Sequence, residues 1–221
     1  MDYRIDCNPG YSRLEVTLGE GEKIISDSGA LAWMDPEMEV ATTTRGGIFK
    51  GLKRKILSGE SFFQNTYTAT EEGARISLVP GCPGDIASID LKGELFLQKG
   101  AFLASEAGIE VDSKWDGLRG FFNEGLFILH LTGSGRLFFN AYGDIQEIDV
   151  DGEYVVDNGY AVAWEPTLQY RLSRSGKIRS FLFSDQFLLR FSGQGKVWVQ
   201  SRSPQALAAW VYPYRPKKQR N

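Results

Sequence analysis

The chain has 221 residues, of which 42% are hydrophobic and 24% are charged, a composition typical of a globular protein with a sizeable core. Its formal net charge of −3 gives no sign of a general nucleic-acid-binding surface. Cys7 and Cys82 lie far apart and match no zinc or redox signature, so we expect free thiols. No apolar run is long enough to span a membrane, and the polar stretch 1–10 lacks the features of a signal or transit peptide. These features together predict a cytoplasmic protein.

Short apolar or alternating runs recur along the whole chain, and Gly, Asp, Asn or Ser closes each one. They cover residues 13–18, 30–34, 74–79, 86–91, 126–132, 136–141, 161–164 and 196–200. Alternation over short runs with turn residues between them predicts an all-β sandwich, barrel or β-helix. A helix is expected only as a short turn at 116–123 and after Ser203, which precedes Pro204 as a capping residue.

The chain also contains internal repeats. The runs 24–34, 95–105 and 154–164 share one template in which Gly29, Gly100 and Gly159 align. A second run follows each of them, and these second runs cover residues 58–81, 123–143 and 184–203. The Gly-x-Gly sequences at 133–135 and 193–195 are interpreted as hairpin turns.

The repeats predict three related units near residues 22–81, 93–143 and 152–203. Units this short bury their apolar faces against one another. We therefore expect one compact β domain over residues 1–221, with a basic tail at 213–221.

Glycine, basic and aromatic residues crowd together between residues 45 and 70. Glycine permits close approach of the backbone, which favours a projecting loop that binds an anion or a partner. The alternative is a solvated basic connection, or an apolar tip buried in a neighbouring subunit. The candidate binding residues are Gly46, Gly47, Lys50, Gly51, Lys53, Arg54 and Lys55. The spacing of Gly46 and Gly51 resembles a phosphate-binding loop, but Leu52 stands where such a loop requires lysine.

No set of residues in the sequence assembles a recognisable catalytic or metal site. His130 is the only histidine, and it lies in an alternating run without a nucleophile nearby in the sequence. An acidic row could hold Ca²⁺ or Mg²⁺ or act as catalytic carboxylates, but it equally fits a solvated strand face. The row comprises Asp144, Glu147, Asp149, Asp151 and Glu153. The tryptophans at 33, 115, 164, 198 and 210 fit core or interface positions, with ligand stacking as the alternative.

Several segments resemble the altered inheritance of mitochondria protein 24 family. They are GGIFKGLKRKILSGESFFQNTYT, PGDIASIDL with FLQKGAFLAS, GLFILHLTGSGRLFFNAYG and VDNGYAVAWEPTLQY. The resemblance implies a fold like that of the tryptophan RNA-binding attenuator protein (TRAP-like), a duplicated short double-stranded β-helix, in a homo-oligomer. The family has no established catalytic residues to carry over. Without a presequence, the chain looks like a prokaryotic member.

The sequence therefore favours a non-enzymatic, homo-oligomeric scaffold or interaction module without a cofactor, and a trimer is one such oligomer. A small-ligand or RNA-binding module that uses segment 45–55 is the alternative. An enzyme that uses the acidic row is a third hypothesis.

Overall fold

The computed structural model describes residues 1–43, 64–112, 127–174 and 187–216. Nearly all the secondary structure in these residues is β-strand, with one short α-helix near the C-terminal end. The predicted all-β class is thus confirmed. The turn predicted at 116–123 lies outside the described residues. In the described part of the chain, no helix is long and apolar enough to cross a membrane.

The strands are mostly short, but four of them have 13 or 14 residues. In chain order they are β1 (Asp2–Asp6), β2 (Arg13–Leu18), β3 (Lys23–Asp27), β4 (Leu31–Met34), β5 (Met38–Thr43), β6 (Gln64–Ala69), β7 (Ala74–Leu78), β8 (Ile86–Gln98), β9 (Phe102–Glu106), β10 (Ile109–Asp112), β11 (Ile128–Asn140), β12 (Ile145–Asp157), β13 (Ala161–Trp164), β14 (Gln169–Arg174) and β15 (Phe187–Gln200). The helical elements are η1 (Lys99–Ala101), α2 (Pro204–Val211) and η4 (Tyr212–Tyr214).

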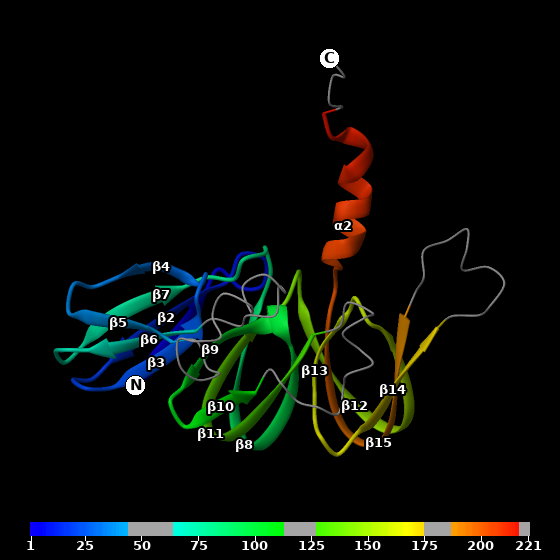
Figure 1. The fold of residues 1–221 in the computed structure, drawn as a ribbon, viewed down its shortest axis with the longest axis horizontal. Coiled ribbons are helices and arrows are strands. Elements are labelled where there is room, and N and C mark those ends of the chain that lie inside the picture. Colours follow the sequence, from blue (N-terminus) through cyan, green and yellow to red (C-terminus); the bar gives the residue numbers. More distant parts are fainter. Residues whose placement is uncertain (44–63, 113–126, 175–186, 217–221) are drawn as a thin grey trace, which may run out of the picture.

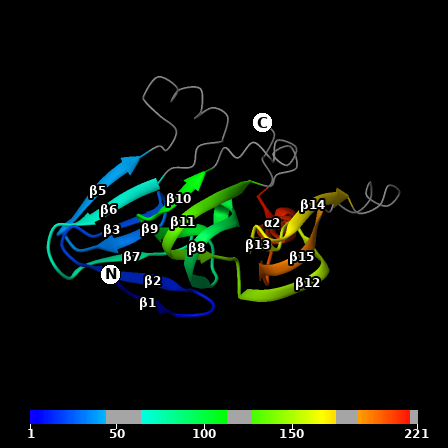
Figure 2. The same cartoon turned by 90° about the horizontal axis from the view of Figure 1, so that it is seen from below.

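The strands form two antiparallel sheets. One has the order β1-β2-β7-β4, and the other runs β12-β15-β13-β8-β11-β9-β3-β6-β5, with β10 added to β11 and β14 added to β15. Figure 1 shows three strand groups in a row: the first group (β1–β7) on the left, the second (β8–β11) in the middle and the third (β12–β15) on the right. Figure 2 shows the same order from below.

Each group uses the same local pairing. Strands β4, β9 and β13 follow the glycines Gly29, Gly100 and Gly159, and they pair with β7, β11 and β15 respectively. Each of these three pairs contains a register shift. Strands β5, β10 and β14 pair with β6, β11 and β15. The aligned sequences therefore occupy corresponding places in the three groups.

The interpretation of the Gly-x-Gly sequences as hairpin turns is wrong, because both lie inside continuous strands. Gly133 of β11 lies opposite Gly93 of β8, and Gly193 of β15 lies opposite Gly152 of β12. All four have a positive φ, which glycine adopts without the steric cost of a Cβ atom. Two facing glycines let the paired strands bend while the ladder continues, and β8 and β12 curve strongly in Figure 1.

The apolar core is divided among three clusters that cross the group boundaries. Leu103 and Ala104 of β9 are buried in the cluster formed mainly by the first group. Val162 and Ala163 of β13 are buried in the cluster formed mainly by the second group. Strand β9 of the second group therefore completes the core of the first group, and strand β13 of the third group completes the core of the second.

Candidate functional site

The candidate binding residues predicted from the sequence lie outside the described residues. They are Gly46, Gly47, Lys50, Gly51, Lys53, Arg54 and Lys55. The segment that contains them joins β5 to β6, and segments 113–126 and 175–186 join the corresponding strands of the other two groups. The basic segment thus belongs to a connection that recurs in all three groups.

The acidic row lies along β12, which pairs with β15. Glu147 accepts a hydrogen bond of 3.0 Å from Trp198 Nε1 and also contacts the Lys196 ammonium, and this contact raises the pKa of Lys196. Asp151 accepts a hydrogen bond from Gln194 Nε2. Asp149 is almost fully exposed. These are cross-strand contacts on a solvated face, and the described residues hold no group of three potential metal ligands.

His130 is half-buried on β11, and its contacts are with neighbouring strands. Its Nε2 lies 2.9 Å from the Glu94 carboxylate, and its ring stacks on Phe96 at 5.1 Å between centroids. Phe96 in turn packs against Trp164 and Tyr170, whose hydroxyl pKa is raised far above its usual value by burial. The histidine therefore lies beside an aromatic core.

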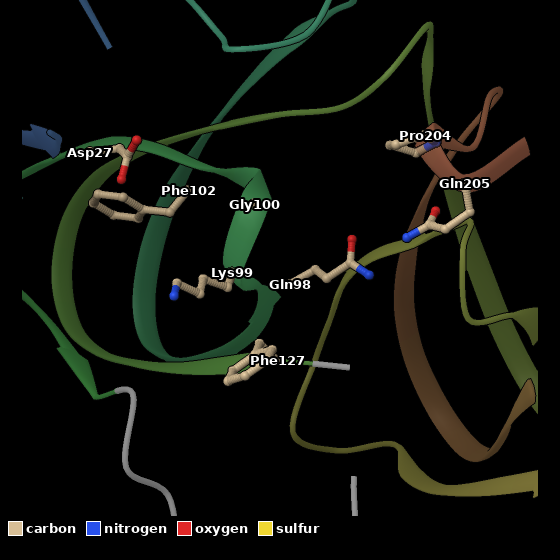
Figure 3. A pocket seen from close by; sticks show the side chains of 8 residues that line it. All are labelled: Asp27, Gln98, Lys99, Gly100, Phe102, Phe127, Pro204 and Gln205. Carbon is tan, nitrogen blue, oxygen red and sulfur yellow. The ribbon is translucent and has the colours of Figure 1, made fainter. Parts of the chain in front are cut away.

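A cavity of about 480 Å³ lies where the turns of the first and second groups meet the start of helix α2. Figure 3 shows the Asp27 carboxylate beside the Phe102 ring, and the Lys99 side chain between Phe102 and Phe127. Gln98 and Gln205 point toward one another across the other side. The cavity thus has a charged end, two aromatic walls and an amide end, a mixture typical of small-molecule sites.

Asp27 is the acidic residue of this cavity and is partly buried. Burial raises the pKa of its carboxyl, while hydrogen bonds from the Gly29 and Ser28 amides and the charge of Lys99 act in the opposite direction. The Lys99 ammonium lies 5.3 Å from the centre of the Phe127 ring. Asp27 and Lys99 thus place groups of opposite charge in the lining of the cavity.

Two strands leave apolar side chains exposed at the ends of the row of groups. Trp33 and Leu31 of β4 are exposed, and the Arg13 guanidinium lies 5.0 Å above the Trp33 ring. Tyr154 and Val155 of β12 are also exposed. Among the described residues, β4 pairs only with β7, and β12 pairs only with β15. Each strand therefore has one open, apolar edge.

The predicted helix after Ser203 is confirmed as α2. The Ser203 hydroxyl accepts a hydrogen bond from the Ala206 amide, and Pro204 occupies the first turn. None of the residues of α2 or η4 is buried, and the helix stands out from the sheets in Figure 1. Its exposed apolar side chains are Leu207, Trp210, Val211, Tyr212 and Tyr214. We call α2 and η4 the C-terminal arm.

Sequence reasoning missed both the cavity and the open edges. Asp27 and Lys99 stand beside the aligned glycines of the internal repeats, so the repeat alignment carried a signal for the cavity. For the open edges, the sequence signal was a difference in residue size at one position of the repeats: Trp33 stands in the first repeat where the other two have Ala104 and Ala163. The tryptophans were expected at core or interface positions. Trp164 and Trp198 are in the core, Trp33 and Trp210 are exposed and could only be interface positions, and Trp115 lies outside the described residues.

These features define an antiparallel all-β protein of three strand groups with a projecting C-terminal arm. The model of the family described as mitochondrial biogenesis AIM24 matches residues 3–202, so the chain belongs to the AIM24 family, and the resemblance seen in the sequence is confirmed. The crystal structure of protein SPYM3_0169 from Streptococcus pyogenes is similar to the chain with a TM-score of 0.80 and 26% identity, over 97% of this chain and 99% of that one. A comparison with curated proteins gives no match.

Proposed function

We propose that the chain is a non-enzymatic scaffold that assembles with further copies of itself. In this proposal it is one compact domain built from three repeat units, near residues 22–81, 93–143 and 152–203. The shared pairing of β4, β9 and β13 and the cores that cross group boundaries support this description. A cytoplasmic location and the TRAP-like description of the fold remain proposals.

The observation that carries the proposal is the pair of open apolar edges. A monomer in water leaves few large apolar side chains together at a strand edge, because an exposed edge of this kind pairs with other chains. Here β4 exposes Leu31 and Trp33 in the first group, and β12 exposes Tyr154 and Val155 in the third. Self-association covers both edges.

The proposal is tested by measuring the solution mass of the full chain with light scattering over a range of concentrations. We expect a mass above the 24.7 kDa of one chain, and a shift toward it in Val155→Lys, which places a charge on the β12 edge. The matched control is Val40→Lys, which changes an equally exposed valine on β5 and should leave the mass unaltered. A wild-type protein that remains monomeric at every concentration would overturn the scaffold function.

The cavity favours a second candidate function, the binding of a small molecule. Its Asp27 carboxylate and Lys99 ammonium suit a small zwitterion, whose ammonium group would face the first and whose carboxylate would face the second. Phe102 and Phe127 offer an apolar surface for the rest of such a ligand.

Calorimetric titration with L-leucine, isopentylamine and 4-methylpentanoate tests this second function. We expect L-leucine to bind, and the two analogues, each with a single charge, to bind at least tenfold more weakly. Asp27→Asn should abolish the binding, since it removes the charge while keeping an acceptor for the Gly29 amide. Asp157→Asn is the matched control, because Asp157 accepts the corresponding bond from Gly159 but does not line the cavity. Equal binding of all three compounds, or none, would argue against a zwitterion site.

RNA or ligand binding through the basic segment 45–55 remains a separate proposal. It predicts salt-sensitive binding that weakens when Lys53, Arg54 and Lys55 are replaced by alanine. The absence of RNA or phosphate binding by the intact chain would remove it.

A further inference from the structure

Strand pairing between neighbouring groups follows one register. Ala104 of β9 lies opposite Ser26 of β3, and Ala163 of β13 lies opposite Leu97 of β8. Ala104 and Ala163 are each the fourth residue after the aligned glycine of their own group. Ser26 and Leu97 are each the third residue before the aligned glycine of the preceding group. The next positions agree as well, since Ser105 faces Ile25 and Trp164 faces Phe96, each in antiparallel pairing.

The first group has a strand of this type, β4, but no preceding group to pair with. The third group has the receiving strand, β12, but no following group. We propose that β4 of one copy adds to the free edge of β12 in a second copy, in the register used inside the chain. Trp33 then faces Val156, and Met34 faces Val155. This inference rests on the proposed scaffold function and identifies its contact.

The burial of corresponding residues supports this pairing. Trp33 is 53% exposed, whereas Ala104 and Ala163, which hold the same place in β9 and β13, are fully buried. Val155 is 43% exposed, whereas the corresponding Phe96 of β8 is buried. The large exposed residues of β4 and of the second half of β12 thus stand where the other groups bury their counterparts.

The core clusters lead to the same conclusion. Leu103 and Ala104 of β9 enter the core of the first group, and Val162 and Ala163 of β13 enter the core of the second. The core of the third group receives no such strand from the described part of the chain. Ala32 and Trp33 of a second copy would supply it, as the corresponding pairs do within the chain.

The other open strands provide an internal comparison. In the described residues, β5, β10 and β14 each pair with one neighbour, so this edge is open in all three groups. Because this edge is unpaired in all three groups, the pairing within the chain gives no reason to expect a partner strand there. Val40 on β5 is therefore a suitable control position, because it is as exposed as Val155 but lies on an edge without a predicted partner.

The contact joins two different surfaces, so it is head-to-tail. Each copy offers β4 at one end and β12 at the other, and repetition of the contact gives a closed ring or an open filament. The contact is small, because the corresponding ladders within the chain have three facing pairs (β3–β9) and two (β13–β8). Each contact alone is therefore weak, and the assembly depends on concentration.

Disulfide trapping between two separately tagged variants tests the register. Met34→Cys in one copy and Val155→Cys in the other should place the two thiols on facing residues, whose Cα atoms are about 4.5–5.5 Å apart in antiparallel pairs and thus within disulfide range. Both variants carry Cys7→Ser and Cys82→Ser, since the chain has two free thiols. Oxidation of the mixture with oxidised glutathione should yield a disulfide-linked pair that contains both tags.

The controls separate this arrangement from others. Val40→Cys mixed with Val155→Cys should give no linked pair, and each variant oxidised alone should give none. Thermal melts establish beforehand that each variant is folded, and Val155→Lys, read by solution mass, tests the same edge without a thiol. A wild-type oligomer whose Met34→Cys and Val155→Cys variants do not link would overturn the register but leave the scaffold function standing. A linked pair formed by Val155→Cys alone would show a symmetric contact and also overturn the inference, whereas a monomeric wild type would remove the scaffold function itself.

Discussion

Arg13 Nη2 donates a hydrogen bond of 2.6 Å to Asp6 Oδ2, and the two residues face one another at the last pair of the β1–β2 ladder. The bond to Arg13 holds the pKa of the Asp6 carboxyl below its usual value, and nearby Arg4 acts in the same direction. Arg75 lowers the pKa of Asp35 in the same way at the end of β4. Both ion pairs lie in the four-stranded sheet.

These ion pairs predict a loss of stability in acid. Because the folded-state pKa of Asp6 lies below the unfolded value of about 3.9, the pair stabilises the fold above that pH. This contribution is lost as the pH falls through the folded-state pKa. We expect the urea midpoint to decrease below pH ~4, and the decrease should be smaller in Asp6→Asn. Asp2→Asn, which changes a carboxylate opposite Thr17 on the same strand, should retain the wild-type dependence on pH.

Among the described residues, Trp164 is the largest fully buried side chain, and it packs against Phe96, Tyr170 and Phe191. Replacing it with alanine leaves a large cavity in the core of the third group. Trp164→Ala should lower the free energy of unfolding by about 3–5 kcal/mol, measured by urea denaturation. Trp210→Ala, at an exposed tryptophan of the C-terminal arm, should change it by less than about 0.5 kcal/mol. A similar effect of the two substitutions would contradict the assignment of Trp164 to the core.

Gly84 makes a parallel bridge with Gly143, and its backbone carbonyl accepts a hydrogen bond from the Ser12 amide. A Cβ atom at Gly84 would overlap the carbonyl oxygen of Ala141, so the two segments that form this bridge would have to move apart. Gly84→Ala should lower the melting temperature markedly. Gly81→Ala is the matched control, since a Cβ atom there meets nothing within 4 Å. If both variants melt like the wild type, the bridge does not form in solution.

The C-terminal arm should contribute little to stability, since none of its residues is buried. Deletion of residues 207–221 keeps Ser203, Pro204 and Gln205 in place. We expect the melting temperature to change by less than about 2 °C, because the described residues that are removed bury no side chain. A larger decrease would mean that the arm packs against the body of the protein or against another copy. Light scattering on the same variant separates these two cases.

Much of the fold could be predicted from local sequence patterns. Alternation of apolar residues identified many of the strands but not β1, β5, β10 or β14. Ser203 before Pro204 identified the start of α2, because such patterns act through a few neighbouring residues. Gly133 and Gly193 were misinterpreted, since a glycine that permits a turn also permits a bend within a strand. Which of the two occurs depends on the opposite strand, where Gly93 and Gly152 allow the ladder to continue.

The sequence by itself determined the β class, the family and the positions of the aligned strands, because these follow from local periodicity and from matched segments. Only the tertiary structure decided that Asp27 and Lys99 share a cavity, since the turns that carry them meet through long-range packing. It also decided that Trp33 is exposed while Ala104 in the corresponding place is buried. The burial of a strand depends on whether another group of strands covers it, and no pattern within the strand records that.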